Sequence, residues 1–508
     1  MPINSKRIAK NTVFLYIRLV FVMGVTLYMS RVVLDKLGAS DYGLYYVVFG
    51  VIGMVSFLNT TLSSGTSRFI TFALGRGDLK KLSVTFTTTL ITHICMALLI
   101  LIIGETIGLW YATHVMVVAE DRMLAAMWVY QISILSSMIS ILHVPFYSEI
   151  MAHERMNVYA YVGIYEALAK LFVVYLLVNS PFDKLVSFAF LQFLVSFSTF
   201  LFYVWYSRKQ FEEVSFKMVF EKDIFKSIAK FSGWNVIATL SNTLMSQGVI
   251  MLFNLFFLPV VVAAQAIANQ ISQAILMLVN NVRHAVSPQI IKLYAEKNYK
   301  ESQRLTFLSA EFIFYLLLLL GVPIIMSMDH ILNIWLVEVP EYTSSFARLI
   351  VLQAILSNFN AAFYTPMVAA NKLSKNSYSA IFLCILQFIL LWFLFYCGSS
   401  PLWARYLAII STIIYSFIVK PYILWKDIEY DLKELYYVIW HCTRVIIPIG
   451  FVCMLVYFFI PQDTLWKSIV LFIISIIVVA FVSYMNMSNN IKKRVLGFVL
   501  RKVKIKQK

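Results

Sequence analysis

Long apolar runs separated by short polar connections dominate the chain. Fourteen of these runs approach the roughly 20 residues that a helix needs to cross a bilayer. None of the connections is long enough to hold a separate soluble domain. The pattern predicts an all-α polytopic membrane protein with about 14 transmembrane helices, near residues 12–33, 42–62, 84–110, 124–146, 158–178, 185–206, 232–256, 260–282, 305–327, 345–368, 377–397, 402–424, 443–460 and 465–485.

The composition supports this prediction. Hydrophobic residues make up 61% of the chain and charged residues 13%, whereas soluble domains average about 45–50% and about 25%. The five cysteines lie in or beside apolar runs without CxxC spacing, so we expect small buried side chains rather than disulfides. No cleavable leader is expected, because the first apolar run is too long and contains Arg18.

Basic residues predict the orientation of the spans, because Lys and Arg near membrane helices prefer the cytoplasmic side. When charges at span ends are assigned to the nearer face, 32 of the 42 Lys and Arg fall on the face of the two chain ends and seven fall on the other. Lys420 is counted on the first face and Arg405 on the second. Both termini are therefore expected in the cytoplasm. The basic tail at 487–508 is expected to follow anionic membrane lipids rather than nucleic acid.

A weak internal repeat divides the chain. Ile8-Ala9-Lys10 recurs 220 residues later, and Ser67 recurs as Ser287 at the same offset. Each half would hold six spans, an even number, so the halves would be parallel repeats with a substrate site between them. We expect an N-terminal six-helix lobe, a C-terminal six-helix lobe, an additional helix pair and the basic tail, at 1–210, 211–430, 431–486 and 487–508.

The first span and the connection after it carry a recognisable signature. Asn11-Thr12 and Leu15-Tyr16 are followed by Ser30-Arg31-Val32-Val33-Leu34, by Leu37-Gly38 and by Asp41-Tyr42-Gly43-Leu44-Tyr45. These residues resemble the N-terminal signature of Wzx-type polysaccharide-unit flippases, the O-antigen and capsule exporters of the multidrug/oligosaccharidyl-lipid/polysaccharide exporter superfamily. Many members have twelve spans, whereas lipid II flippases of the superfamily have fourteen.

The resemblance implies a MATE-like fold in the bacterial cytoplasmic (inner) membrane. It also implies translocation of oligosaccharide repeat units linked to undecaprenyl diphosphate, for O-antigen, other lipopolysaccharide or capsule biosynthesis. Polysaccharide polymerase or other synthesis machinery would then be a partner.

A diphosphate-linked substrate would need cationic contacts, and arginine suits phosphate through bidentate hydrogen bonds. Arg18 lies within the first span and Arg31 at its outer end, and Arg68 and Arg283 follow the second span of each half. Charged residues inside a membrane usually face a cavity or a partner. The alternatives are a snorkelling side chain at Arg18, an interfacial anchor at Arg31, and ordinary cytoplasmic loop charges at the other two.

Amide side chains recur at helical spacing in the second half of the chain. Such stripes can serve as interhelical glue, but three striped helices in one half favour the polar wall of a substrate cleft. The predicted lining residues are Asn235, Asn242, Gln265, Asn269, Gln273, Asn280, Gln353 and Asn360.

Three ionisable residues within the spans are candidates for ion coupling. Glu166 and Lys170 lie four apart on one helix face in the favourable order, which fits a titratable site and a structural pair equally well. Glu311 lies in the ninth span and would otherwise form an interhelical hydrogen bond. No metal site is expected, because the seven histidines are scattered and His153-Glu154 lacks the second histidine of HExxH.

The sequence contains no GxxxxGK[ST] phosphate loop and no GxSxG nucleophile motif. We therefore expect no enzymatic activity and no cofactor, and an ion gradient, the membrane potential or removal of product would supply the energy. The leading hypothesis is a flippase that works by alternating access. The alternatives are a multidrug/cation antiporter of the same fold, which would need an acidic cleft, and a polytopic membrane enzyme such as a polymerase or acyltransferase.

Overall fold

A computed structural model describes residues 5–487, apart from positions 55, 76, 215–218, 371 and 460–464. Side chains are described for these residues except within five helices, at 5–19, 56–58, 60, 61, 64, 227–238, 242, 278, 281, 284, 285 and 360. The predicted basic tail, apart from Met487, therefore lies outside the described residues.

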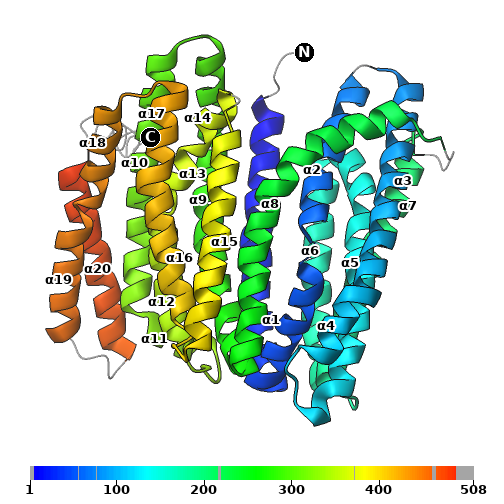
Figure 1. Ribbon diagram of the computed structural model, residues 1–508, viewed down its shortest axis with the longest axis horizontal. Helices are drawn as coiled ribbons and strands as arrows, with labels where there is room; N and C mark the ends of the chain where they lie inside the picture. The colour runs from blue at the N-terminus through cyan, green and yellow to red at the C-terminus, as the bar shows by residue number, and fades with distance from the viewer. Residues whose placement is uncertain are drawn as a thin grey trace, which may run out of the picture. The chain divides into compact units, whose positions relative to one another are not determined.

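The described residues form helices joined by short turns, without a β-strand (Figure 1). Ten helical segments among them are long and apolar enough to cross a membrane. The prediction of an all-α, multi-pass membrane protein is confirmed, while the count of fourteen spans stays a prediction. The helices are α1 (Ser5–Gly53), α2 (Ser56–Gly75), α3 (Leu79–Ile103), α4 (Leu109–His114), α5 (Met123–Ala152), α6 (Met156–Asn179), α7 (Lys184–Gln210), α8 (Lys222–Phe256), α9 (Pro259–Ala295), α10 (Tyr299–Met326), α11 (Met328–Trp335), α12 (Thr343–Leu356), α13 (Asn358–Ala362), α14 (Tyr364–Ala369), α15 (Ser374–Tyr396), α16 (Trp403–Ile414), α17 (Lys420–Ile428), α18 (Leu432–Thr443), α19 (Ile446–Phe459) and α20 (Leu465–Asn486).

The chain forms two compact units. The first comprises Met1–Ala266 and Trp335–Pro340, and the second comprises Ile267–Ile334 and Glu341–Lys508. The division falls within α9. The lobes expected at 1–210 and 211–430, and the helix pair expected at 431–486, stay predictions.

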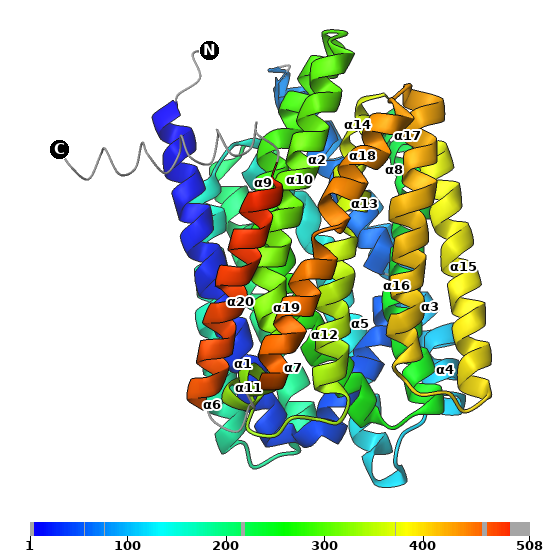
Figure 2. The ribbon, with the colours of Figure 1, turned by 90° about the vertical axis from the view of Figure 1, so that its left-hand side faces the viewer.

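In the first unit, α5 packs against α1, α2, α3 and α7, and α8 packs against α1 and α2. The aromatic side chains of Phe86, Phe146 and Tyr203 bring α3, α5 and α7 together in a buried cluster. In the second unit, α10 packs against α12 and α20, and the rings of Phe314 and Phe359 lie 5.4 Å apart. Helices α19 and α20 lie side by side (Figure 2).

Two helical segments contain a π-helical turn, which accommodates one extra residue. One, Gly104–Gly108, joins α3 to α4, and the other, Tyr415–Val419, joins α16 to α17. At the first turn, the buried Tyr130 hydroxyl of α5 donates a 2.6 Å hydrogen bond to the Gly104 carbonyl oxygen. The bond satisfies a backbone acceptor that would be costly to leave unpaired in hydrocarbon.

The connection expected between the first two spans is a break in a single long helical segment. Gly38 has φ 76° and ψ 165°, a conformation that favours glycine, and it interrupts α1. Helix α1 then continues to Gly53, and α2 begins at Ser56. The span expected at 42–62 is therefore divided between α1 and α2.

Near this break, Arg122 connects three helices of the first unit. Arg122, in the 3₁₀ turn Glu120–Arg122 before α5, bonds Asp41 of α1 and Asp183 before α7, with each shortest N···O distance at 2.6 Å. Burial disfavours the Asp183 carboxylate, but hydrogen bonds from Arg122 and the Val186 amide hold the pKa of Asp183 below its ordinary value. The network ties the starts of α5 and α7 to α1.

All five cysteines are free. Cys384, Cys442 and Cys453 are buried as expected, whereas Cys95 and Cys397 are exposed. The prediction of burial was wrong for these two, because their positions on α3 and at the end of α15 are not covered by the described chain.

Gly43 offers a test of the packing next to the α1 break. A Cβ atom at position 43 would lie 1.9 Å from the carbonyl oxygen of Pro259, whereas a Cβ at Gly24 of the same helix would meet nothing within 4 Å. We expect Gly43→Ala to destabilise the protein by roughly 1–3 kcal/mol through overpacking. Gly24→Ala should be neutral or stabilising by up to roughly 1 kcal/mol.

The measurement is thermal unfolding of both variants in the same detergent. Equal midpoints for Gly43→Ala and the unaltered protein would show that the contact between α1 and the start of α9 is loose.

Candidate functional site

Four of the predicted site residues cannot be placed by their side chains. Those of Arg18, Asn235, Asn242 and Asn360 lie outside the described residues, and their roles stay predictions. Arg31 on α1 and Arg68 on α2 are exposed.

Helix α9 carries the polar positions that the structure brings into contact with other helices of the second unit. Asn269 accepts a 3.3 Å hydrogen bond from the guanidinium of Arg405 on α16. Further along α9, the hydroxyl groups of Ser287 and Thr365, the latter on α14, lie 3.1 Å apart. Polar side chains of α9 therefore contact both α16 and α14.

Between these contacts lies a second guanidinium. Arg283 is half-buried and donates a hydrogen bond to the amide oxygen of Asn280, one turn earlier on α9. Among the described residues, Arg283 forms no ion pair with a carboxylate, whereas Arg122, Arg304 and Arg348 each do so. Its guanidinium has five N–H donors, so the bond to Asn280 leaves donors that could bind an anion.

The remaining predicted lining residues differ in their surroundings. Gln353 of α12 donates a 3.2 Å hydrogen bond to Thr412 of α16, so this amide joins two helices. Gln273 is exposed on α9 in the second unit. Gln265 is buried at 2% exposure and belongs to the first unit. The amides thus include both interhelical contacts and accessible positions.

Two cations in the second unit escaped the sequence analysis. Arg405 had been counted among the outer charges, but it lies in the first turn of α16 and reaches Asn269. Lys420 had been counted among the cytoplasmic charges, but it is 1% exposed, with Nζ 5.2 and 5.4 Å from the ring centroids of Tyr364 and Tyr415. Both residues stand near the ends of the apolar run at 402–424, where the charge count assigned each to the nearer membrane face.

The candidates for ion coupling have partners in the structure. Lys170 donates to Glu166 over 2.6 Å within α6. Glu311 is 5% exposed, and a carboxylate oxygen lies 3.8 Å from Nε2 of His441 on α18. Glu311 and His441 line a cavity of about 980 Å³ in the second unit, together with Arg444. Glu311 is therefore reachable through a polar cavity.

The first unit contains a smaller cavity of about 240 Å³, which is lined by apolar side chains together with several polar ones. It is lined by hydroxyl groups of α5, including Ser136 and Ser140, and by Asn59 of α2, which donates a 3.0 Å hydrogen bond to Ser140. Ser136, Ser137 and Ser140, on the span predicted at 124–146, therefore line this cavity.

No protein-family model and no curated protein sequence matches the chain. Solved structures do match its fold. An inward-facing multidrug resistance MATE family transporter of the MOP superfamily is 15% identical, with TM-score 0.68, and the match covers 83% of this chain and 99% of that one. The lipid II flippase MurJ in an inward closed conformation is 12% identical, with TM-score 0.67 and coverage of 94% and 99%. The predicted MATE-like fold is confirmed.

Cysteine labelling tests whether the polar face of α9 meets water. Gln273 and Ile389 are both exposed on apolar helices, α9 and α15. In a chain whose native cysteines are replaced by alanine, we expect Gln273→Cys to react several-fold faster than Ile389→Cys with a hydrophilic maleimide. The reason is that thiolate formation requires water. Equal protection of both positions would assign Gln273 to lipid or to packing.

Proposed function

We propose that this protein is a flippase that moves lipid-linked oligosaccharide across the bacterial cytoplasmic membrane. The observation that carries the proposal is the pair of guanidiniums along α9. Arg283 is on the helix itself, and Arg405 bonds to Asn269 fourteen residues earlier, which corresponds to roughly 21 Å along the axis. Amides and hydroxyls lie between and beyond the two cations, on a scale that suits an anionic, sugar-bearing head group.

The proposed substrate is an oligosaccharide repeat unit linked to undecaprenyl diphosphate. Guanidiniums would hold the diphosphate through bidentate hydrogen bonds, with Arg18, Arg31 and Arg68 as further contacts along the path. Amides such as Asn269 and Gln273 would exchange hydrogen bonds with the sugar hydroxyls. The isoprenoid tail would stay in lipid while two lobes rock around the head group.

The fold supports transport rather than catalysis, because the matching structures are transporters and a flippase. The MurJ match extends over 94% of this chain, compared with 83% for the MATE transporter named above. We therefore favour a lipid-linked substrate, as in the lipid II flippase, over a soluble drug. A cation antiporter would need carboxylates where α9 presents amides and the guanidinium of Arg283.

Several finer features belong to the same proposal. Both termini would lie in the cytoplasm, with the basic tail on anionic lipids, and the product would pass to polysaccharide polymerase or other synthesis machinery. Glu311, or the Glu166–Lys170 pair, would couple transport to an ion gradient. The glycan would serve O-antigen, capsule or another surface polysaccharide.

Reconstituted transport tests the proposal. We expect the protein in proteoliposomes to expose an undecaprenyl-diphosphate-linked oligosaccharide to an external lectin or glycosidase. Arg283→Ala should slow this step by at least about tenfold, because a charge-assisted hydrogen bond contributes roughly 1.5–3 kcal/mol. Arg283→Lys keeps the positive charge but loses the bidentate guanidinium. Its transport rate should lie between those of the unaltered protein and Arg283→Ala.

Arg304→Ala is the matched control, since Arg304 is exposed and pairs with Glu301 at 3.3 Å. The same transport rate for the Arg283 and Arg304 variants would remove Arg283 from the substrate path. Export of cationic drugs without movement of lipid-linked glycan would overturn the proposed function.

A further inference from the structure

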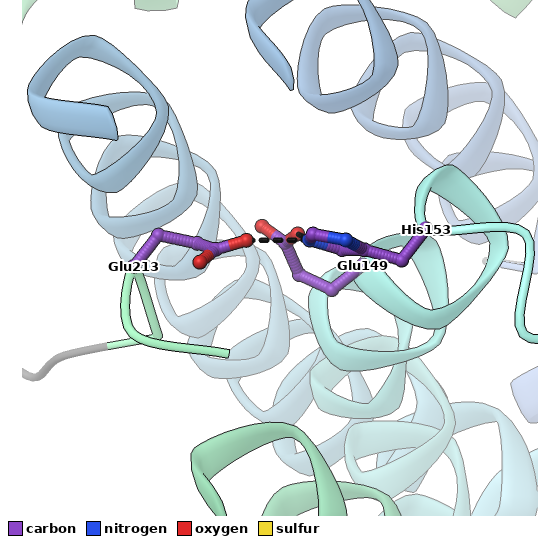
Figure 3. A group of neighbouring side chains, drawn as sticks. All are labelled: Glu149, His153 and Glu213. Atoms are coloured by element: carbon purple, nitrogen blue, oxygen red, sulfur yellow. Dashed lines mark hydrogen bonds and ion pairs between the residues drawn. The ribbon is translucent and has the colours of Figure 1, made fainter. Parts of the chain in front are cut away.

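A cluster of three potential metal ligands lies where α5 and α7 end in the first unit (Figure 3). Glu149 and His153 are four residues apart at the end of α5, and Glu213 follows the end of α7. Nε2 of His153 lies 2.6 Å from Oε1 of Glu213 and 3.9 Å from Oε2 of Glu149. One ligand atom from each residue lies within 4.8 Å of the other two.

The two carboxylates are buried in a way that calls for a counter-charge. The side chain of Glu149 is 0% exposed and that of Glu213 is 4% exposed. Within the described part of the chain, both carboxylate oxygens of Glu149 lack a hydrogen-bond partner. Figure 3 shows this carboxylate directed at His153 and Glu213. Among the described residues, neither carboxylate pairs with Lys or Arg. An isolated buried carboxylate is strongly disfavoured unless a cation or a proton neutralises it.

The surrounding packing holds these ligands in place. The imidazole of His153 stacks on Phe211, with ring centroids 4.1 Å apart and planes at 11°. Phe211 and Val214, on either side of Glu213, belong to the buried cluster that also contains Phe146 of α5. The three side chains are therefore positioned by the core of the unit and need only small side-chain movements to share one ion.

We propose that Glu149, His153 and Glu213 bind a divalent transition-metal ion. One imidazole nitrogen and two carboxylate oxygens suit Zn²⁺, which takes such ligands at about 2.0–2.2 Å. The imidazole disfavours Ca²⁺ and Mg²⁺, which prefer oxygen ligands. His153 is 25% exposed on its side chain, which leaves access for the ion and for a water molecule as fourth ligand.

The charge balance fits such an ion. A divalent cation would neutralise both carboxylates, and His153 would exchange its hydrogen bond to Glu213 for a bond from Nε2 to the metal. The ion would fasten the end of α5 to the segment that leaves α7. Spacing in the sequence does not reveal this set, because Glu213 lies 60 residues after His153. The site is independent of the transport function proposed above.

Metal analysis of the full-length protein tests this inference. Purified chain without an affinity tag is incubated with Zn²⁺, passed through a desalting column and measured by elemental mass spectrometry. We expect about one bound ion per chain and a rise in the thermal midpoint with added Zn²⁺. Co²⁺ in place of Zn²⁺ should give visible absorption bands that report the ligand geometry.

The variants Glu149→Gln and Glu213→Gln keep the side-chain shape and should weaken Zn²⁺ binding by at least about tenfold. Glu212→Gln is the matched control, because Glu212 is the exposed neighbour of Glu213. If Glu149→Gln does not give a monodisperse protein, the test uses Glu213→Gln alone, because Glu213 lies at the edge of the packed cluster. The proposal would be overturned if the folded protein bound no metal, or if Glu212→Gln and Glu213→Gln lowered Zn²⁺ affinity equally. The buried carboxylates would then be neutralised by protons.

Discussion

The absence of water in the membrane interior governs this structure, because a polar group in hydrocarbon must find its partner within the protein. The partners differ in kind. Arg122 lies between two aspartates, Lys170 reaches back one turn to Glu166, and Lys420 lies between aromatic rings. Many hydroxyl groups in the spans bond to the backbone of their own helix, as Thr92 does by donating to the carbonyl oxygen of Thr88. Because so many polar side chains are bonded within the protein, the polar groups that stay accessible are informative about function.

Three residues of the N-terminal signature that resembles Wzx-type flippases have structural roles. Gly38 breaks α1 with a positive φ, Asp41 bonds Arg122, and Gly43 lies where a Cβ would collide with Pro259. All three shape one end of the first unit. A signature made of such positions predicts a fold reliably, which explains why the MATE-like fold is confirmed. It carries little information about cargo, so the identity of the glycan rests on other residues.

The apolar runs predicted the helices well, because burying a backbone in lipid leaves few alternatives. They predicted connections less well. A single positive φ at Gly38 redirects α1 without ending the run of helix. Charge counting assigned Arg405 and Lys420 to the two membrane faces, whereas the structure shows that both contact other helices of the second unit. The Glu149, His153 and Glu213 group depends on two helix ends meeting, which local spacing does not encode.

The π-helical turn at Tyr415–Val419 has a geometric consequence for the segment that contains it. One inserted residue advances the angular phase of the helix by about 100°. Before the turn, Arg405 and Thr412 face α9 and α12, and after it Lys420 meets Tyr364 of α14. A regular α-helix of the same sequence would aim these cations in different directions. The extra residue thus rotates the second half of this helical segment relative to the first. The two halves can therefore present their side chains to different neighbouring helices.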